Sequence, residues 1–128
     1  MQTSTGSTAL NTEAKPICAV LVHVADVARA LDWYQAAFPQ SVRRHLEAFE
    51  FQFLDIGGIC LEIVAADEKV GSGASGSVVY WQVADLYAAV EHFTAIGATL
   101  YRGPIDIQNG LRMCQVRDPW GNCIGLRG

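Results

Sequence analysis

Several marks of common functional classes are missing from this chain. The four cysteines form no CxxC pair, which argues against a zinc knuckle. No apolar run approaches the roughly 18 residues that a membrane-spanning helix needs, so no membrane partner is expected. The first fifteen residues have neither a basic start nor an apolar stretch, and we interpret residues 1–15 as a disordered tail and not as a secretory signal.

Positive charge is also scarce. The net charge is −4, and the only basic cluster is the short run Arg43-Arg44-His45, so no nucleic-acid partner is expected. Most of the cysteines stand in apolar or alternating segments, where a reduced thiol behaves as a small hydrophobe. Reduced thiols are typical of a cytoplasmic protein, which is the location we expect.

The chain contains enough hydrophobic residues to form a packed core. Of its 128 residues 51% are hydrophobic and 17% are charged, a composition typical of one compact domain. We expect that domain to span 16–128.

The clearest pattern is an internal repeat. Val24-Ala25-Asp26 is followed by VARALDWYQAAF, and Val83-Ala84-Asp85 is followed by LYAAVEHFTAIG, with apolar residues at matching positions. Further along, GICLEI from Gly58 matches GNCIGL from Gly121. Two copies are too few for a solenoid, so we expect a pair of related modules.

Each copy predicts the same order of elements. In the first, a valine-rich strand over 17–25 leads to Asp26 as the helix N-cap, because its carboxylate can accept from free first-turn amides. The remaining expected elements are a helix over 27–38, strands over 41–47, 49–56 and 59–65, a linker over 66–77, a strand over 78–84, a helix over 85–96, and strands over 98–103, 110–117 and 122–127. The modules are thus 16–65 and 78–128, each with the order βαβββ.

This plan resembles the vicinal-oxygen-chelate superfamily of glyoxalases, bleomycin-resistance proteins and extradiol dioxygenases. The resemblance rests on the valine-x-aspartate helix start in each copy and on the turn Asp118-Pro119-Trp120-Gly121-Asn122 before the last strand. It implies an α+β fold in which two βαβββ modules form a half-open mixed β-sheet barrel with the helices outside. It also implies a homodimer, which would cover open sheet edges.

The resemblance further implies four positions at which metal-dependent members hold an ion. They correspond here to Ala19, Glu62, Val78 and Gly125, of which only Glu62 carries a ligand atom. His23 does not replace Ala19, because four residues along a strand span about 13 Å, whereas a metal–nitrogen bond is about 2 Å. We therefore expect no metal and no other cofactor.

Strand alternation predicts which side chains face a concave cleft. Valines 20, 22 and 24 are expected to meet the first helix, and the residues between them to face the cleft. Applied to both copies, alternation predicts ten ligand-binding residues: Leu21, His23, Glu50, Gln52, Cys60, Glu62, Tyr80, Gln82, Met113 and Gln115.

These expectations favour a metal-free protein that binds a small organic molecule in the cleft. Two alternatives stay open. One is a glyoxalase-type metal-dependent lyase or isomerase, in which an ion polarises the substrate oxygens. The other is a metal-independent enzyme in which Glu62 or His23 transfers a proton.

Overall fold

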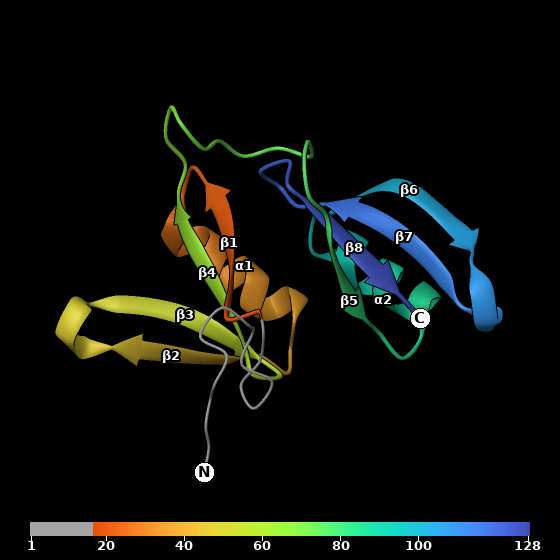
Figure 1. Cartoon of the computed structure of the whole chain (residues 1–128), viewed down its shortest axis with the longest axis horizontal. Coiled ribbons are helices and arrows are strands. Elements are labelled where there is room, and N and C mark those ends of the chain that lie inside the picture. Colours follow the sequence, from red (N-terminus) through yellow and green to blue (C-terminus); the bar gives the residue numbers. More distant parts are fainter. Residues whose placement is uncertain (1–16) are drawn as a thin grey trace, which may run out of the picture.

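The structure is a computed structural model that describes residues 17–128. The expected tail, 1–15, lies outside the described residues. Figure 1 shows two sheets side by side along the longest axis of the molecule, with helix α1 running behind the first sheet and α2 behind the second.

The first sheet is built from residues 19–65. Its strands are ordered β1-β4-β3-β2, with β1 parallel to β4 and the other pairs antiparallel. The elements are β1 (Ala19–Val24), α1 (Val27–Ala37), β2 (Val42–Leu46), the 3₁₀ turn η1 (Glu47–Phe49), β3 (Phe51–Ile56) and β4 (Ile59–Ala65).

The second sheet repeats this topology as β5-β8-β7-β6, with β5 parallel to β8. Residues 66–78 connect the two sheets and contain neither helix nor strand. The elements are β5 (Val79–Gln82), α2 (Leu86–Ala95), β6 (Thr99–Asp106), the 3₁₀ turn η2 (Gln108–Gly110), β7 (Arg112–Arg117) and β8 (Cys123–Arg127).

Both helices begin where the repeat predicts. The carboxylate of Asp26 accepts from the backbone N–H of Arg29 at 3.1 Å, and that of Asp85 accepts from the N–H of Ala88 at 3.1 Å. Each bond satisfies a first-turn amide that lacks a partner within the helix. The internal repeat therefore corresponds to a structural repeat.

One apolar core joins the two modules. Leu31 and Tyr34 of α1 are buried with Leu54 and Leu61 of the first sheet, and Phe93 of α2 belongs to the same cluster. The indole N–H of Trp33 donates to the carbonyl of Ile96 at 2.6 Å, which ties the two helices together. The fold is α+β as predicted, and among the described residues the two sheets share no strand pair that would close a barrel.

The register of β3 differs from expectation. Gly57 and Gly58 have φ of 58° and 89°, which makes a two-residue hairpin turn and pairs Ile56 with Ile59. That turn places Leu54 opposite Leu61, so Leu54 points towards α1 and is fully buried. Phe51 and Phe53 therefore lie on the other face of the sheet, where their rings stack at 6.0 Å.

None of the described helices is long and apolar enough to cross a membrane.

Candidate functional site

Each sheet has one face covered by its helix and one open face. The register assigns the side chains to these faces. The module-one face is defined by Leu21, Phe53, Asp55, Cys60 and Glu62. The module-two face is defined by Tyr80, Gln82, Arg102, Met113, Gln115, Arg117, Cys123, Gly125 and Arg127.

On the module-one face a thiol and a carboxylate lie together. The Cys60 thiol donates to a carboxylate oxygen of Glu62 at 3.5 Å. Burial and then the neighbouring Glu62 raise the pKa of Cys60 to about 11. Because the thiolate is disfavoured here, Cys60 is a hydrogen-bond donor at neutral pH and not a nucleophile.

Asp55 lies beside this pair. It accepts from the backbone N–H of Gly58 at 2.9 Å and from Arg44 Nε at 3.1 Å. These two bonds lower the pKa of the Asp55 carboxyl, the Gly58 bond having the larger effect. The Asp55 charge is thus balanced locally by Arg44.

The structure corrects the expected faces of two residues. Gln52 shares the side of Leu54, which is the helix side, and not the side of Cys60. Glu50 precedes β3 in the left-handed conformation, with φ of 49°, and has no strand face. For Gln52 the reason is the Gly57-Gly58 turn, which reverses the alternation expected for this strand. For Glu50 the reason is the 3₁₀ turn η1, which it ends, so that the strand begins only after it. In their place, Phe53 and Asp55 lie on the module-one face.

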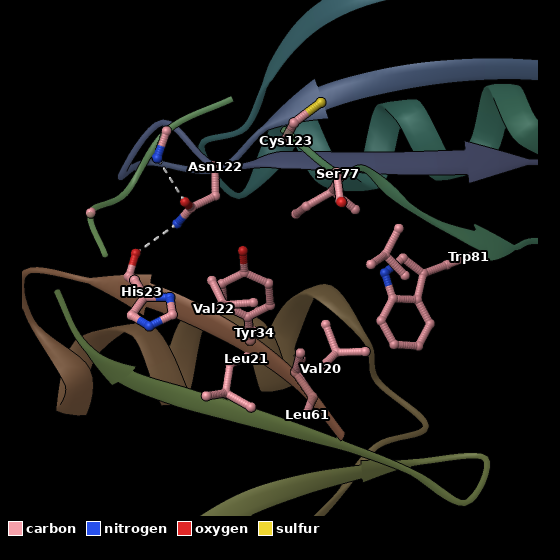
Figure 2. A pocket seen from close by; sticks show the side chains of 14 residues that line it. Val20, Leu21, Val22, His23, Tyr34, Leu61, Ser77, Trp81, Asn122 and Cys123 are labelled. Atoms are coloured by element: carbon pink, nitrogen blue, oxygen red, sulfur yellow. Dashed lines mark hydrogen bonds between the residues drawn. The ribbon is translucent and has the colours of Figure 1, made fainter. Parts of the chain in front are cut away.

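His23 lies on β1, the outer strand of the first sheet, where the register gives it the same face as Leu21. It borders a small cavity of about 180 Å³. Figure 2 shows this cavity between β1 and the segments that lead into β5 and β8, with Tyr34 and Trp81 also on its walls. We call it the seam cavity. Of the ten predicted residues only Leu21 and His23 line it. Its volume is below the range of about 300–1,000 Å³ usual for ligand pockets.

The seam cavity is bounded by the turn at 118–122. Buried Asp118 accepts from the Tyr34 hydroxyl at 2.5 Å and from the backbone N–H groups of Trp120 and Asn122 at 2.8 Å each. The Asn122 amide donates to the carbonyl of His23 at 3.1 Å and accepts from the N–H of Gly73 at 2.9 Å, as Figure 2 shows. The turn therefore fastens module two to α1, β1 and the linker, which is a structural role.

The module-two face has a hydrogen-bonded centre. The Gln115 amide N–H donates to the Tyr80 hydroxyl at 2.7 Å, and the Cys123 thiol donates to the Gln115 carbonyl at 3.4 Å. Gly125 pairs with both Tyr80 and Gln115. A Cβ at Gly125 would lie 2.5 Å from the Tyr80 ring, so the ring fills the space that a side chain at 125 would occupy.

Beside this centre is a cavity of about 520 Å³, which we call the module-two cavity. Its size is within the range usual for small organic ligands. It is lined by Tyr80, Gln82, Val83, Ala84, Leu111, Arg127 and Gly128. Met113, half-buried, stands opposite Arg127 on the neighbouring strand. Polar donors and an apolar wall thus meet at one cavity.

The donor set at the four family positions does not fit a metal ion. Ala19, Val78 and Gly125 supply no ligand atom, and Tyr80 covers Gly125. Glu62 is the one ligating side chain, and its described partner is the thiol of Cys60. Within 17–128 no three His, Cys, Asp or Glu side chains are grouped as metal ligands. A divalent ion requires several converging ligands, so the residues at these positions do not form a site for one.

The comparisons with known proteins agree with this architecture. The model of the Glyoxalase/Bleomycin resistance protein/Dioxygenase superfamily matches residues 17–126. The chain belongs to that superfamily. The superfamily resemblance seen in the sequence is thereby confirmed. No curated protein matches.

Solved structures of other proteins are similar to this fold. A glyoxalase/bleomycin resistance protein/dioxygenase family enzyme from Burkholderia phytofirmans PsJN is 21% identical, with a TM-score of 0.68 over 85% of this chain and 94% of that one. The fosfomycin resistance protein FosX of Listeria monocytogenes is 15% identical, with a TM-score of 0.66 over 87% and 88%. TioX from Micromonospora sp. ML1 is 25% identical, with a TM-score of 0.63 over 87% and 96%.

Sequence reasoning missed the arginines of the module-two face. Arg127 is two residues after Gly125 on β8, so simple alternation was enough to find it. Arg102 was hidden, because β6 has register shifts on either side of it that break the alternation.

Proposed function

We propose that this superfamily member binds a small organic molecule at the module-two cavity without a metal ion. The observation that carries the proposal is the Tyr80 ring packed against Gly125. It fills one of the four positions at which a metal-dependent relative holds its ion, and it presents an aromatic surface and a hydroxyl there instead. Tyr80, Gln82, Met113 and Gln115, four of the ten expected ligand-binding residues, are at this face.

The chemistry of the cavity supports binding over metal-assisted catalysis. Apolar contact area comes from the Tyr80 ring, Val83 and Leu111. Directional hydrogen bonds can come from the Tyr80 hydroxyl, Gln82 and Arg127. Lewis-acid catalysis of the glyoxalase type would need ligands that Ala19, Val78 and Gly125 do not provide.

Proton transfer without a metal is a second candidate, and one contact favours it. Glu62 lies on the open module-one face with the Cys60 thiol as its hydrogen-bond partner, so its carboxylate can reach a bound molecule. His23, the other proton-transfer candidate, lines the small seam cavity and not the module-two cavity. Turnover of a bound compound, lost in Glu62→Gln, distinguishes this candidate from simple binding.

We also propose that the protein is a homodimer in a reducing, cytoplasmic compartment. Large apolar side chains on the first sheet are exposed, including Leu21 at 52%, Val42 at 48% and Leu46 at 46%. A second copy that covers these side chains removes them from water. All four cysteines are free thiols, which is in keeping with a reducing environment.

Purification without chelator, followed by elemental analysis and native mass spectrometry, tests the binding proposal. We expect well under one equivalent of zinc, nickel or iron per chain, and a co-purified or added organic compound that stays bound in EDTA. Gly125→Ala, which forces the Tyr80 ring to move, is expected to weaken that binding. Gly71→Ala is the matched control, because a Cβ there meets nothing within 4 Å. One equivalent of metal bound through Glu62 would contradict the proposal.

A further inference from the structure

Charge is segregated within module two. The chain from 78 to 128 holds four arginines. Arg112 bonds Asp106 at 3.2 Å and lies over the ring of Tyr87 on α2, so it belongs to the helix side. The register places the other three, Arg102, Arg117 and Arg127, on the module-two face.

None of the four acidic side chains between 78 and 128 shares that face. Asp85 caps α2, Glu91 lies on α2, and Asp118 is buried in the turn before β8. Asp106 pairs with Arg112 and bonds it, so it belongs to the helix side. The module-two face is therefore positively charged, although the chain as a whole has a net charge of −4. A local positive field of this kind attracts anions.

Two of these arginines are held in place by aromatic rings. The Arg127 guanidinium lies 5.0 Å from the centroid of the Tyr80 ring, and that of Arg117 lies 5.2 Å from the ring of Tyr101. Arg117 Nε also donates to the Gly121 carbonyl at 3.1 Å. Among the described residues neither arginine forms an ion pair. Stacking orients a guanidinium without neutralising it, so its other N–H donors stay available.

Arg102 brings a third charge to the centre of the face. It stands opposite Gln115 on β6. Burial raises the pKa of the Cys123 thiol, whereas the positive charges of Arg117 and Arg102 lower it. Both guanidinium groups therefore act electrostatically on the centre of this face.

The Tyr80 hydroxyl adds an oriented donor. Its oxygen already accepts the Gln115 amide, and Gln115 is itself held by the Cys123 thiol. The hydroxyl proton has no acceptor among these partners and is available to a ligand.

From these contacts we propose that the ligand is an organic oxyanion: a carboxylate, phosphate or phosphonate on an apolar body. The inference rests on the proposed binding function and specifies its ligand class. Arg127 and the Tyr80 hydroxyl bind the anionic oxygens, with Arg102 and Arg117 adding to the field. The apolar body packs against Leu111 and the Tyr80 ring in the module-two cavity. A guanidinium fork suits such oxygens because it can donate two parallel bonds.

Dissociation constants for three probes test the proposal: benzoate, phenyl phosphate and the neutral benzamide, measured by ligand-observed NMR in EDTA at fixed ionic strength. Benzoate and phenyl phosphate are expected to bind at least about tenfold more tightly than benzamide. Arg127→Gln should remove about tenfold of the anion affinity and leave benzamide unchanged. Arg127→Lys keeps the charge but loses the planar guanidinium, so its affinity for the two anions should lie between those of the wild type and of Arg127→Gln. Arg44→Gln, on the module-one face, is the matched control and should change nothing.

Equal affinity for all three probes, or anion binding that survives Arg127→Gln and Arg102→Gln together, overturns the oxyanion assignment and leaves the binding function standing. Anion binding that is lost in EDTA overturns the metal-free function and leaves the oxyanion assignment standing. Binding of no probe by the folded wild-type protein counts against both.

Discussion

At the scale of single residues, the proposed metal-free binding depends on which side chains stand at the four positions that the superfamily resemblance assigns to a metal ion. Gly125 is the clearest case, because its missing side chain makes room for the Tyr80 ring. The absence of ligand atoms at three of four positions was readable from the sequence. The sequence did not show that the Tyr80 ring fills the space beside Gly125, because this depends on how side chains pack across β5 and β8.

The Tyr34 hydroxyl is expected to contribute to stability. It donates to buried Asp118 at 2.5 Å, and burial followed by the Asp118 charge raises the pKa of Tyr34 well above its usual value. Tyr34→Phe should lower the free energy of unfolding by about 1–2 kcal/mol in urea titration, because a buried carboxylate loses a donor. Tyr87→Phe on the surface of α2 is the control, with an expected change within about 0.5 kcal/mol. Equal effects of the two substitutions would contradict the role of the bond.

The pH dependence of Cys60 tests its contact with Glu62. With a pKa of about 11, the thiol should react slowly with iodoacetamide at pH 8 and faster as the pH rises towards 11. Glu62→Gln removes the negative charge that helps to raise the pKa of Cys60, so labelling of Cys60 at pH 9 should accelerate. Peptide mass spectrometry of the labelled protein measures this site separately from Cys18. An unchanged rate in Glu62→Gln would show that the contact does not hold in solution.

At the scale of elements, helices were easier to predict than strands. The N-caps Asp26 and Asp85 are local signals, and both helices begin directly after them. The phase of β3 was predicted wrongly when alternation placed Gln52 on the cleft face, although the Gly57-Gly58 turn held the decisive information. A two-residue hairpin pairs Ile56 with Ile59 and hence Leu54 with Leu61, whatever the neighbouring residues are. The wrong face of Gln52 followed from that error, whereas Glu50 was misplaced because η1 delays the start of the strand.

At the scale of the whole molecule, the two modules share one core and one fastening turn. Asn122 reaches the carbonyl of His23 and the linker, and Trp33 reaches Ile96. These contacts join segments far apart in the chain, so no local sequence pattern predicts them. The open faces of both sheets remain for a ligand or a second copy.

The proposed dimer predicts a mass of twice 13.9 kDa in light scattering at micromolar concentration. Leu46→Glu, which places a charge on the exposed apolar side of the first sheet, should shift the protein towards the monomer. Val70→Glu is the control: it introduces the same charge in the linker, at a valine that is similarly exposed, 45%, and it should leave the dimer intact. A wild-type mass near 13.9 kDa would argue against the dimer.

Metal-free binding at the module-two face is tested most directly by amide chemical-shift mapping. The ¹⁵N-labelled protein in EDTA is titrated with phenyl phosphate. The account predicts saturable shifts that centre on Tyr80, Gln115, Gly125 and Arg127 and leave the amides of the module-one face in place. Shifts confined to module one, or shifts that appear only after a divalent metal is added, would contradict it.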